Sequence, residues 1–294
     1  MLEKLELFLK KYPKIDNGKN THSIIYPKED MGSFTIPMDQ LDIFYKLVCK
    51  SIFKNNEHFS ILEKIQPICP FVIDLDFKYK DNIESRQYNS NIMKQLIQSI
   101  FTILNDFYNL SNDQQVCWIM EKETILKARK NQQQYQMKDG IHLLFPYIIA
   151  EKKSYIEVRE ELVKIDFHKM VQDENLVSPS NNMGEIVDKS IYKGGNWFIY
   201  GSGKENEIRY ELTEILKYQD GHLLNLPIDI YKNDPLEIIK LNSVGRHTQK
   251  NVEYSSMLEN RLKPNSNNNT VQHMNQDDHE EEEPKINNTK KYDK

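Results

Sequence analysis

The sequence predicts an α+β fold with a mixed or largely antiparallel sheet. Residues 70–79 alternate large apolar and polar side chains, which is the period-two pattern of a strand with one buried face. Residues 92–108 instead repeat apolar side chains along one broad helical face, as in a helix that packs on a sheet. The other expected strands and helices follow no strict βαβα order, and this mixture favours the α+β class.

Weaker patterns of the same two kinds predict the remaining elements. Helices are expected at 2–12, 39–52 and 151–170, and strands at 23–26, 61–65, 116–120, 140–146, 185–192 and 196–200. The polar stretch 122–138 is expected to be an exposed loop or helix, and a solvated connector rather than a binding loop. Beyond Asp220 the patterns weaken, and only short strands are expected there.

Composition divides the 294 residues into a folded part and a tail. We expect one domain over 1–262 and a disordered, Asn-rich and acidic tail or linker over 263–294. The tail has almost no large apolar side chain whose burial could offset the entropy of ordering. Residues 265–294 carry seven acidic and four basic side chains, and so account for −3 of the formal net charge of −5. The remaining −2 shows no basic excess, so any nucleic-acid site must be a local patch.

Cysteine usage and hydropathy exclude several classes of protein. The three cysteines, Cys49, Cys69 and Cys117, form no C-x-x-C pair, so neither a zinc module nor a disulfide framework is expected. The N-terminus is charged and lacks the apolar region of a signal peptide. No stretch approaches the roughly 18 apolar residues of a membrane span. These features predict a soluble intracellular protein with no membrane partner.

Asp74 and Asp76 are the first candidates for chemistry. Both lie on the polar face of the expected strand 70–79. Residues two apart on a strand are roughly 6.5–7 Å apart at their Cα atoms, so both carboxylates can converge on one ion. Two adjacent anions raise each other's pKa, and a divalent cation removes that conflict. Carboxylate oxygens suit Mg²⁺ or Mn²⁺, although two solvated aspartates at a strand end fit the same pattern.

Three further candidates belong to, or directly follow, expected strands. His142 faces the same way as the aspartates, Asp188 belongs to the expected strand 185–192, and Lys204 ends a Gly-Ser-Gly-Lys segment. Each residue alone fits an ordinary structural role. The Gly-Ser-Gly-Lys segment is no ATP-binding P-loop, because that motif needs glycine where Phe198 stands and serine or threonine where Glu205 stands.

Together these residues make up a chemically coherent set. Three carboxylates can hold two Mg²⁺ ions at the ~3.5–4 Å separation that serves in-line phosphoryl displacement. One ion lowers the pKa of an attacking hydroxyl group, and the other neutralises the triphosphate and the leaving pyrophosphate. A histidine and a lysine beside the ions can contact phosphate oxygens. The set as a whole is typical of a nucleotidyltransferase.

The order and spacing of five segments resemble the three-motif signature of the archaeo-eukaryotic primase (AEP) superfamily. The resemblance is greatest to the primase domains of large nucleocytoplasmic DNA viruses that are associated with D5-type helicases. The segments are 21–23, 70–77, 139–146, 186–192 and 196–204. The similarity extends over about residues 20 to 245. It implies a catalytic core with an α/β unit packed on an RRM-like unit, and an active site between the two.

The resemblance also implies a role for each candidate residue. Asp74, Asp76 and Asp188 match the catalytic, metal-binding acids, and His142 and Lys204 match residues that contact the nucleotide. The chain departs from the pattern at one place. Many relatives carry an arginine shortly before the aromatic strand, where this chain has Gly-Asn-Trp at 195–197. Triphosphate binding therefore depends on Lys204 or on another cation.

A primase must also hold a single-stranded template, which calls for a cationic groove and stacking aromatic side chains. Trp197 is one of the aromatic candidates, but a place in the core is the more favoured interpretation. The full set of template-binding candidates is Lys122, Lys127, Arg129, Lys130, Lys138, Tyr192, Lys193 and Trp197.

The resulting hypothesis is a DNA primase or primase-polymerase that makes primers from NTPs or dNTPs with two Mg²⁺ or Mn²⁺ ions. Two other functions fit the same residues: a metal-dependent nuclease, and a non-catalytic replication module that binds single-stranded DNA or a helicase. The chain has no Walker A motif, so the resemblance implies a superfamily 3 (D5-type) helicase encoded separately or downstream. A viral origin would imply the host-cell cytoplasm or a viral replication factory.

Overall fold

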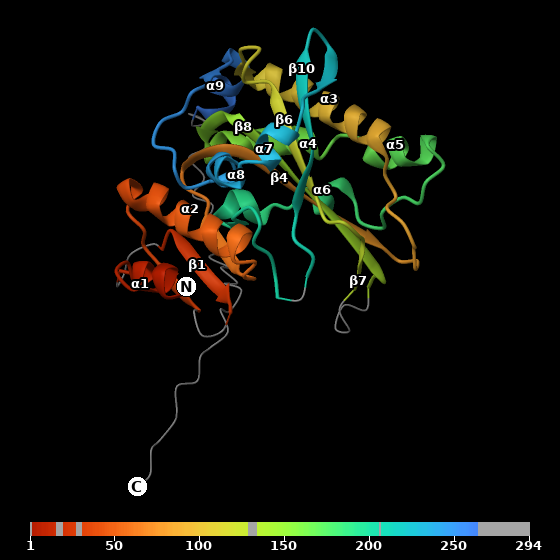
Figure 1. Ribbon diagram of the computed structural model, residues 1–294. Helices are drawn as coiled ribbons and strands as arrows, with labels where there is room; N and C mark the ends of the chain where they lie inside the picture. The colour runs from red at the N-terminus through yellow and green to blue at the C-terminus, as the bar shows by residue number, and fades with distance from the viewer. Residues whose placement is uncertain (1, 16–19, 28–30, 129–133, 206, 264–294) are drawn as a thin grey trace, which may run out of the picture. The chain divides into compact units, whose positions relative to one another are not determined.

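The computed structural model describes residues 2–15, 20–27, 31–128, 134–205 and 207–263 (Figure 1). The chain from Met1 to Leu262 forms one compact unit. The expected tail, 263–294, lies outside the described residues except for Lys263, and so stays a prediction. No helix in the described ranges is long and apolar enough to cross a membrane.

The larger sheet has the strand order β11-β10-β6-β8-β4, and a short strand β7 pairs with β8. All of its recorded strand pairs are antiparallel, which confirms the predicted α+β class with antiparallel pairing. The strands are β4 Ile68–Tyr79, β6 Val116–Glu121, β7 Leu126–Lys127, β8 Met137–Glu151, β10 Glu211–Gln219 and β11 His222–Asn225.

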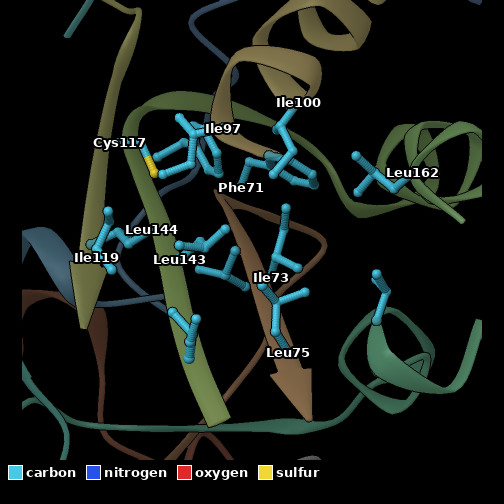
Figure 2. Packing of buried hydrophobic residues seen from close by; sticks show 14 of the residues in the cluster. Phe71, Ile73, Leu75, Ile97, Ile100, Cys117, Ile119, Leu143, Leu144 and Leu162 are labelled. Carbon is cyan, nitrogen blue, oxygen red and sulfur yellow. The ribbon is translucent and has the colours of Figure 1, made fainter. Parts of the chain in front are cut away.

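Helix α3, Ser90–Phe107, packs its apolar face into the core beside β4. The helix begins at Asn89, whose side chain accepts a hydrogen bond from the Ile92 amide group. Figure 2 shows Ile97 and Ile100 of α3 in the same packed cluster as Phe71 and Ile73 of β4. Three helices contact α3: α4 Lys152–Leu162, α5 Phe167–Asp173 and α9 Ser256–Leu262.

A second, four-stranded sheet has the order β2-β1-β3-β9. Its strands are β1 His22–Tyr26, β2 Gly32–Phe34, β3 Ser60–Lys64 and β9 Asn196–Phe198. Helices α1 Leu2–Leu9 and α2 Leu41–Cys49 contribute to a separate apolar cluster with this sheet. A 3₁₀ turn at Met38–Gln40 precedes α2, and a π-helical turn at Lys50–Lys54 follows it.

The chain after β11 returns to both sheets. Helix α8, Pro235–Asn242, contacts α2, while α7, Asp229–Lys232, precedes it. A two-stranded sheet then joins β5, Tyr108–Asn109, to β12, Glu253–Tyr254. The C-terminal part of the compact unit therefore makes two contacts: α8 packs on α2 beside the smaller sheet, and β12 pairs with β5 directly after α3.

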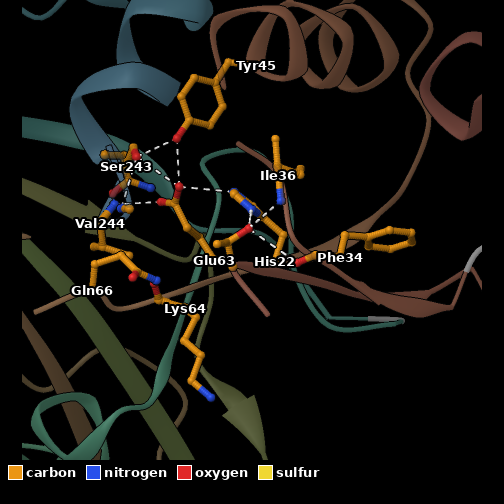
Figure 3. A network of polar contacts seen from close by, with 12 residues as sticks. His22, Phe34, Ile36, Tyr45, Glu63, Lys64, Gln66, Ser243 and Val244 are labelled. Atoms are coloured by element: carbon orange, nitrogen blue, oxygen red, sulfur yellow. Dashed lines mark hydrogen bonds and ion pairs between the residues drawn. The ribbon is translucent and has the colours of Figure 1, made fainter. Parts of the chain in front are cut away.

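Buried Glu63 is the polar link between the smaller sheet and this returning segment (Figure 3). Its carboxylate accepts hydrogen bonds from His22 Nε2 at 3.2 Å, the Tyr45 hydroxyl group at 2.7 Å, Ser243 Oγ at 3.0 Å and the Val244 amide group at 2.6 Å. Burial raises the pKa of Glu63, but the hydrogen bond and charge of His22, with the other donors, bring that pKa below its ordinary value. The carboxylate is thus stabilised in its charged form although it is fully buried.

Two expected elements differ from the structure. The helix expected at 151–170 is divided into α4 and α5. The strand expected at 185–192 is wrong: a short helix α6, Met183–Ile186, is followed by a single bridge between Val187 and Leu75 and a 3₁₀ turn. The physical reason is a capping box, in which Asn182 and Glu185 satisfy each other's amide groups and start a helical turn.

Sequence patterns also missed two strands of the larger sheet. The stretch expected as a connector, 122–138, contains β7 and the start of β8, which is twice as long as the expected strand 140–146. Strand β10 was not expected. It carries charged and polar residues between its apolar ones, and its pairing with β6 includes a register shift that interrupts strict alternation.

We predict that Glu63→Ala lowers the free energy of unfolding by about 3–5 kcal/mol, because it leaves the donors around Glu63 buried without their shared acceptor. Denaturant unfolding at neutral pH measures this loss. The exposed Glu84→Ala is the control, with an expected change within about 0.5 kcal/mol.

The same experiment has a defined pH dependence. The folded-state pKa of Glu63 is lowered, so its contribution is complete above the ordinary carboxyl pKa and is lost as the pH falls through the folded-state pKa. The stability difference between wild type and Glu63→Ala should therefore shrink on acidification. A difference that stays constant at low pH would contradict the ionised state of Glu63.

Candidate active site

The pairing of β4 with β8 brings the first two motifs together. In this register Asp74 lies opposite His142, and Asp76 lies opposite Gly140. His142 Nε2 is 3.6 Å from Asp74 Oδ1. The apolar residues that alternate with the aspartates are buried in the core, so the polar face of β4 is directed away from α3 as the period-two pattern predicts.

Asp188 approaches the aspartate pair from the other side of β4. Its amide group donates a hydrogen bond to the Asp74 carbonyl oxygen at 3.0 Å. Its carboxylate accepts from the amide group of Ser190 at 2.8 Å and from the Ser190 hydroxyl group at 2.7 Å. The guanidinium group of Arg159 donates to the carbonyl oxygens of Gly184 and Val187 and holds this segment in place.

The segment 180–188 therefore covers the edge of β4 without forming a strand. Asn181 donates to the Asp76 carbonyl oxygen at 2.8 Å and accepts from the Lys78 amide group at 3.0 Å. These side-chain bonds satisfy backbone groups that a neighbouring strand would otherwise pair. Asp188 reaches the site through this irregular edge, and not through the strand expected from the sequence.

Lys204 lies in the turn between β9 and β10. The Gly203 amide group donates to the Phe59 carbonyl oxygen at 3.0 Å, and the Ser60 hydroxyl group donates to the Gly203 carbonyl oxygen. Gly201 has a φ of +83°, a backbone conformation that favours glycine. The turn is thus fixed to the start of β3, while the Lys204 side chain is exposed.

All five residues predicted for the site line one cleft of about 190 Å³. Lys122 and Lys138 line it as well. They lie 3.0 and 3.8 Å from the Glu207 carboxylate, respectively. Burial raises the pKa of Glu207, but the hydrogen bond and charge of Lys122, followed by the charge of Lys138, bring it to about 2. The sequence predictions missed Glu207, Tyr210 and Asn196 as lining residues.

The two strand aspartates are electrostatically crowded. Burial raises the pKa of Asp74 well above its ordinary value, and the charges of Asp76 and Asp188 raise it further. Burial and the charge of Asp188 likewise raise the pKa of Asp76. Asp74 Oδ1 is buried and has no hydrogen-bond partner among the described residues. Burial and like charges both destabilise the ionised form of these carboxylates, and a bound cation would stabilise it.

A divalent cation fits this donor set. Asp74 and Asp76 offer carboxylate oxygens, which Mg²⁺ and Mn²⁺ prefer, and Asp74 Oδ1 is free of protein hydrogen bonds within the described part of the chain. In the same part of the chain, no three acidic, imidazole or thiol groups form a ready-made metal cluster. Mg²⁺ commonly takes one or two carboxylates and completes its shell with waters and substrate phosphates, so two aspartates suffice for the protein's share.

His142 is held between two aromatic rings. The Tyr210 ring stacks on it with a centroid distance of 3.6 Å, and the Trp197 ring lies at 4.3 Å. Burial lowers the pKa of His142 to about 3, with the charges of Lys122 and Lys204 adding to the effect. The imidazole ring is therefore neutral at physiological pH and offers a hydrogen bond without a charge.

The close approach of Tyr210 explains why the first residue of the Gly-Ile-His motif is glycine. A Cβ atom on Gly140 would lie 2.6 Å from the Tyr210 hydroxyl oxygen. Only glycine at this position leaves room for Tyr210 to stack on His142. The motif thus combines a histidine with the space needed by the ring that orients it.

The candidates for template binding separate into four groups. Tyr192 and Trp197 are both 2% exposed; Tyr192 donates to the Val72 carbonyl oxygen, and Trp197 donates to Asn242. Their burial corrects the interpretation of either ring as a stacking platform and confirms the favoured core position of Trp197. Lys122 and Lys138 belong to the cleft, and Lys127 and Lys193 are exposed. Arg129 and Lys130 lie outside the described residues.

The chain matches a known family over most of the residues that build this cleft. Residues 21–216 match the family described as "C962R protein N-terminal AEP domain". The chain belongs to this family of AEP domains, as the resemblance of its motifs indicated.

Two viral proteins are similar to the chain. It is 29% identical over 219 residues to "Putative helicase L207/L206" of Acanthamoeba polyphaga mimivirus, a match that covers 72% of the chain and 22% of that protein. It is 25% identical over 226 residues to "Putative helicase 184R" of Invertebrate iridescent virus 6, covering 70% of the chain and 22% of that protein. The chain therefore spans about a fifth of the length of these relatives.

We predict that Asp74→Asn raises the free energy of unfolding of the metal-free protein by about 1–3 kcal/mol, because each unit by which burial and like charges raise a carboxyl pKa corresponds to about 1.4 kcal/mol. The substitution removes a charge that lies beside two other carboxylates and keeps the side-chain shape. Denaturant unfolding in the presence of a chelator measures the change, with the exposed Asp81→Asn as the control.

Added Mn²⁺ should stabilise the two proteins to different extents. It should raise the unfolding midpoint of wild type more than that of Asp74→Asn, because a cation bound to the folded state stabilises it by mass action. Equal shifts in both proteins would show that Asp74 does not bind the ion.

Proposed function

We propose that the chain is a template-directed nucleotidyltransferase, a DNA primase or primase-polymerase that uses two Mg²⁺ or Mn²⁺ ions. The observation that carries the proposal is the convergence of Asp74, Asp76, Asp188, His142 and Lys204 in one cleft of an AEP domain. In this reaction a 3′-hydroxyl group attacks the α-phosphorus of an NTP or dNTP, and pyrophosphate leaves.

The three carboxylates take the role of metal ligands in this proposal. Asp74 and Asp76 lie on one rigid strand, and the backbone bond from Asp188 to Asp74 couples the third acid to the same strand. Divalent ions held there would lower the pKa of the attacking hydroxyl group and neutralise the phosphates. Asp188 now shares its oxygens with Ser190, so we assign it to completing the site after Asp74 and Asp76.

The remaining residues of the cleft bind and orient the nucleotide. Neutral His142 donates a hydrogen bond to a phosphate oxygen, and its ring is kept from rotating by the two rings around it. Lys204 has an exposed side chain and reaches the triphosphate as a point charge. Lys122 and Lys138 add positive charge to the cleft and compensate for the arginine that many relatives carry before the aromatic strand.

We further propose the partners and architecture that the family resemblance implies. The smaller sheet with α1 and α2 corresponds to one unit of the AEP core, and the larger antiparallel sheet with α3 and α4 corresponds to the RRM-like unit. The partners are a single-stranded DNA template and a D5-type helicase, encoded separately or downstream. The two viral relatives are each named "Putative helicase", and these names support the helicase as a partner.

Primer synthesis tests the central proposal. Wild type should make short products from labelled nucleotides on single-stranded DNA with Mn²⁺ or Mg²⁺ and no primer, while Asp74→Ala/Asp76→Ala should make none. Asp81→Ala, which changes an exposed aspartate, should retain activity. Absence of products on both unprimed and primed templates would contradict the proposal, and loss of DNA without added nucleotides would favour a nuclease.

Steric coupling between Gly140 and Tyr210 gives a second test. We predict that Gly140→Ala lowers kcat/KM by about a hundredfold, because the added methyl group displaces Tyr210 and with it His142. Tyr210→Phe removes the oxygen atom that the methyl group meets and keeps the stacked ring. The double variant Gly140→Ala/Tyr210→Phe should therefore recover most of the activity.

The double-mutant cycle distinguishes this mechanism from general damage to the fold. Tyr210→Leu, which removes the ring, should resemble Gly140→Ala and should not be improved by combination with it. Additive losses in Gly140→Ala and Tyr210→Phe would contradict the proposed stacking role. The unfolding midpoints of all variants provide the structural control.

A further inference from the structure

An open hollow of about 460 Å³ adjoins the catalytic cleft. Tyr26, His58, Glu207 and Ile208 line it. Glu207 and Ile208 also line the cleft that holds the aspartates, so the two spaces share a wall. The hollow and the catalytic cleft therefore lie next to each other.

The His58 ring is fixed in orientation by hydrogen bonds at both nitrogens. Nε2 donates to the Lys204 carbonyl oxygen at 3.2 Å, and Nδ1 accepts from the Arg209 guanidinium group at 3.1 Å. Arg209 also donates to the Glu57 carbonyl oxygen at 3.1 Å. The ring therefore has a set position relative to the turn that carries Lys204.

Tyr26 supplies a second ring at the end of β1. It meets the His58 ring edge to face, with a centroid distance of 5.4 Å and an interplanar angle of 77°. Its side chain is half-buried, and its hydroxyl group has no recorded hydrogen bond within the described ranges. Tyr26 belongs to neither of the two apolar clusters formed by those residues. Neither core packing nor hydrogen bonding thus explains why an aromatic ring lies at this rim.

We propose that this hollow is a nucleobase subsite, in which the base of the incoming nucleotide stacks on the Tyr26–His58 pair while its triphosphate lies at Lys204 and the aspartates. This inference rests on the function proposed above. Aromatic rings stack with every base, and the exposed Ile208 side chain (38%) adds an apolar surface. The fixed His58 ring links the base and the phosphate positions, because the same ring binds the backbone of Lys204.

The subsite predicts low selectivity among bases. Stacking on an aromatic face is tolerant of sequence, since it reads no hydrogen-bond pattern. Selection of the correct base then falls to the template. This division is suited to an enzyme that must accept each of four nucleotides in turn.

Calorimetric titration of the whole chain tests the subsite without turnover. The ligands are ATP, dATP, inorganic tripolyphosphate and a short oligodeoxynucleotide, each titrated separately. Mg²⁺ is present and no template is added. Tyr26→Leu should weaken ATP and dATP binding by about 5–150-fold, the effect of losing one base–aromatic stack. Tripolyphosphate binding should not change. Tyr26→Phe, which keeps the ring, should bind ATP and dATP as wild type does.

Two controls make the outcome decisive. Ile25→Ala changes an exposed neighbour that lines neither space and should leave all affinities unchanged. Ile208→Ala should weaken nucleotide binding severalfold without altering the unfolding midpoint, even if Tyr26→Leu destabilises the fold.

Three results would overturn the inference, and they differ in what they exclude. Equal nucleotide binding by wild type, Tyr26→Leu and Ile208→Ala would overturn the subsite alone. Weakened binding of the oligodeoxynucleotide but not of ATP or dATP would assign the hollow to a base of the strand. Failure of wild type to bind any nucleotide would overturn the proposed function as well.

Discussion

The crowding of three carboxylates beside one strand is the constraint on which the rest of the structure depends. Asp74 and Asp76 have raised pKa values because burial and like charges act in the same direction. Such an arrangement costs folding free energy, so the surrounding scaffold must be rigid enough to maintain it. The long β4–β8 pair, with α3 packed beside it, provides this rigidity. The segment 180–188 then adds Asp188 through backbone and side-chain bonds to β4.

His142 is the point at which the two sheets meet. The residue itself lies on β8 of the larger sheet, Trp197 lies on β9 of the smaller sheet, and Tyr210 directly precedes β10. The stack of three rings therefore joins strands from both sheets beside the aspartates. A change in the relative position of the sheets would move the imidazole ring. The geometry of the cleft is accordingly a property of the whole compact unit.

Local patterns predicted those parts of the site that depend on one element at a time. Alternation along 70–79 placed Asp74 and Asp76 on the face opposite the core, and the same pattern oriented His142. The prediction that Asp188 lies on a strand was wrong. Its segment is joined to the edge strand β4 by side-chain hydrogen bonds and single backbone bonds, and it forms no regular ladder of backbone hydrogen bonds. The Asn-x-x-Glu spacing at 182–185 was a local signal for the helical turn found there.

Other features depend on long-range pairing, which no local pattern contains. Tyr210 contacts His142 only because β10 returns to β6, and β10 lacks a clean alternation. Lys122 and Lys138 belong to a stretch that has the composition of a solvated connector, yet β8 carries Lys138 into the cleft. A Cβ atom at position 140 would clash with the Tyr210 hydroxyl group, which explains why this residue is glycine. This explanation becomes visible only after the strand pairing is known.

The Glu63 network has a consequence for how the domain can be divided. The residues that match the AEP family end at 216, whereas Ser243 and Val244 supply two of the hydrogen bonds to Glu63. A fragment cut to the family boundaries would keep every acidic residue of the cleft but would leave a buried carboxylate short of donors and α2 without the contact of α8. The hydrogen bonds that stabilise the buried Glu63 carboxylate therefore extend beyond the residues that match the family.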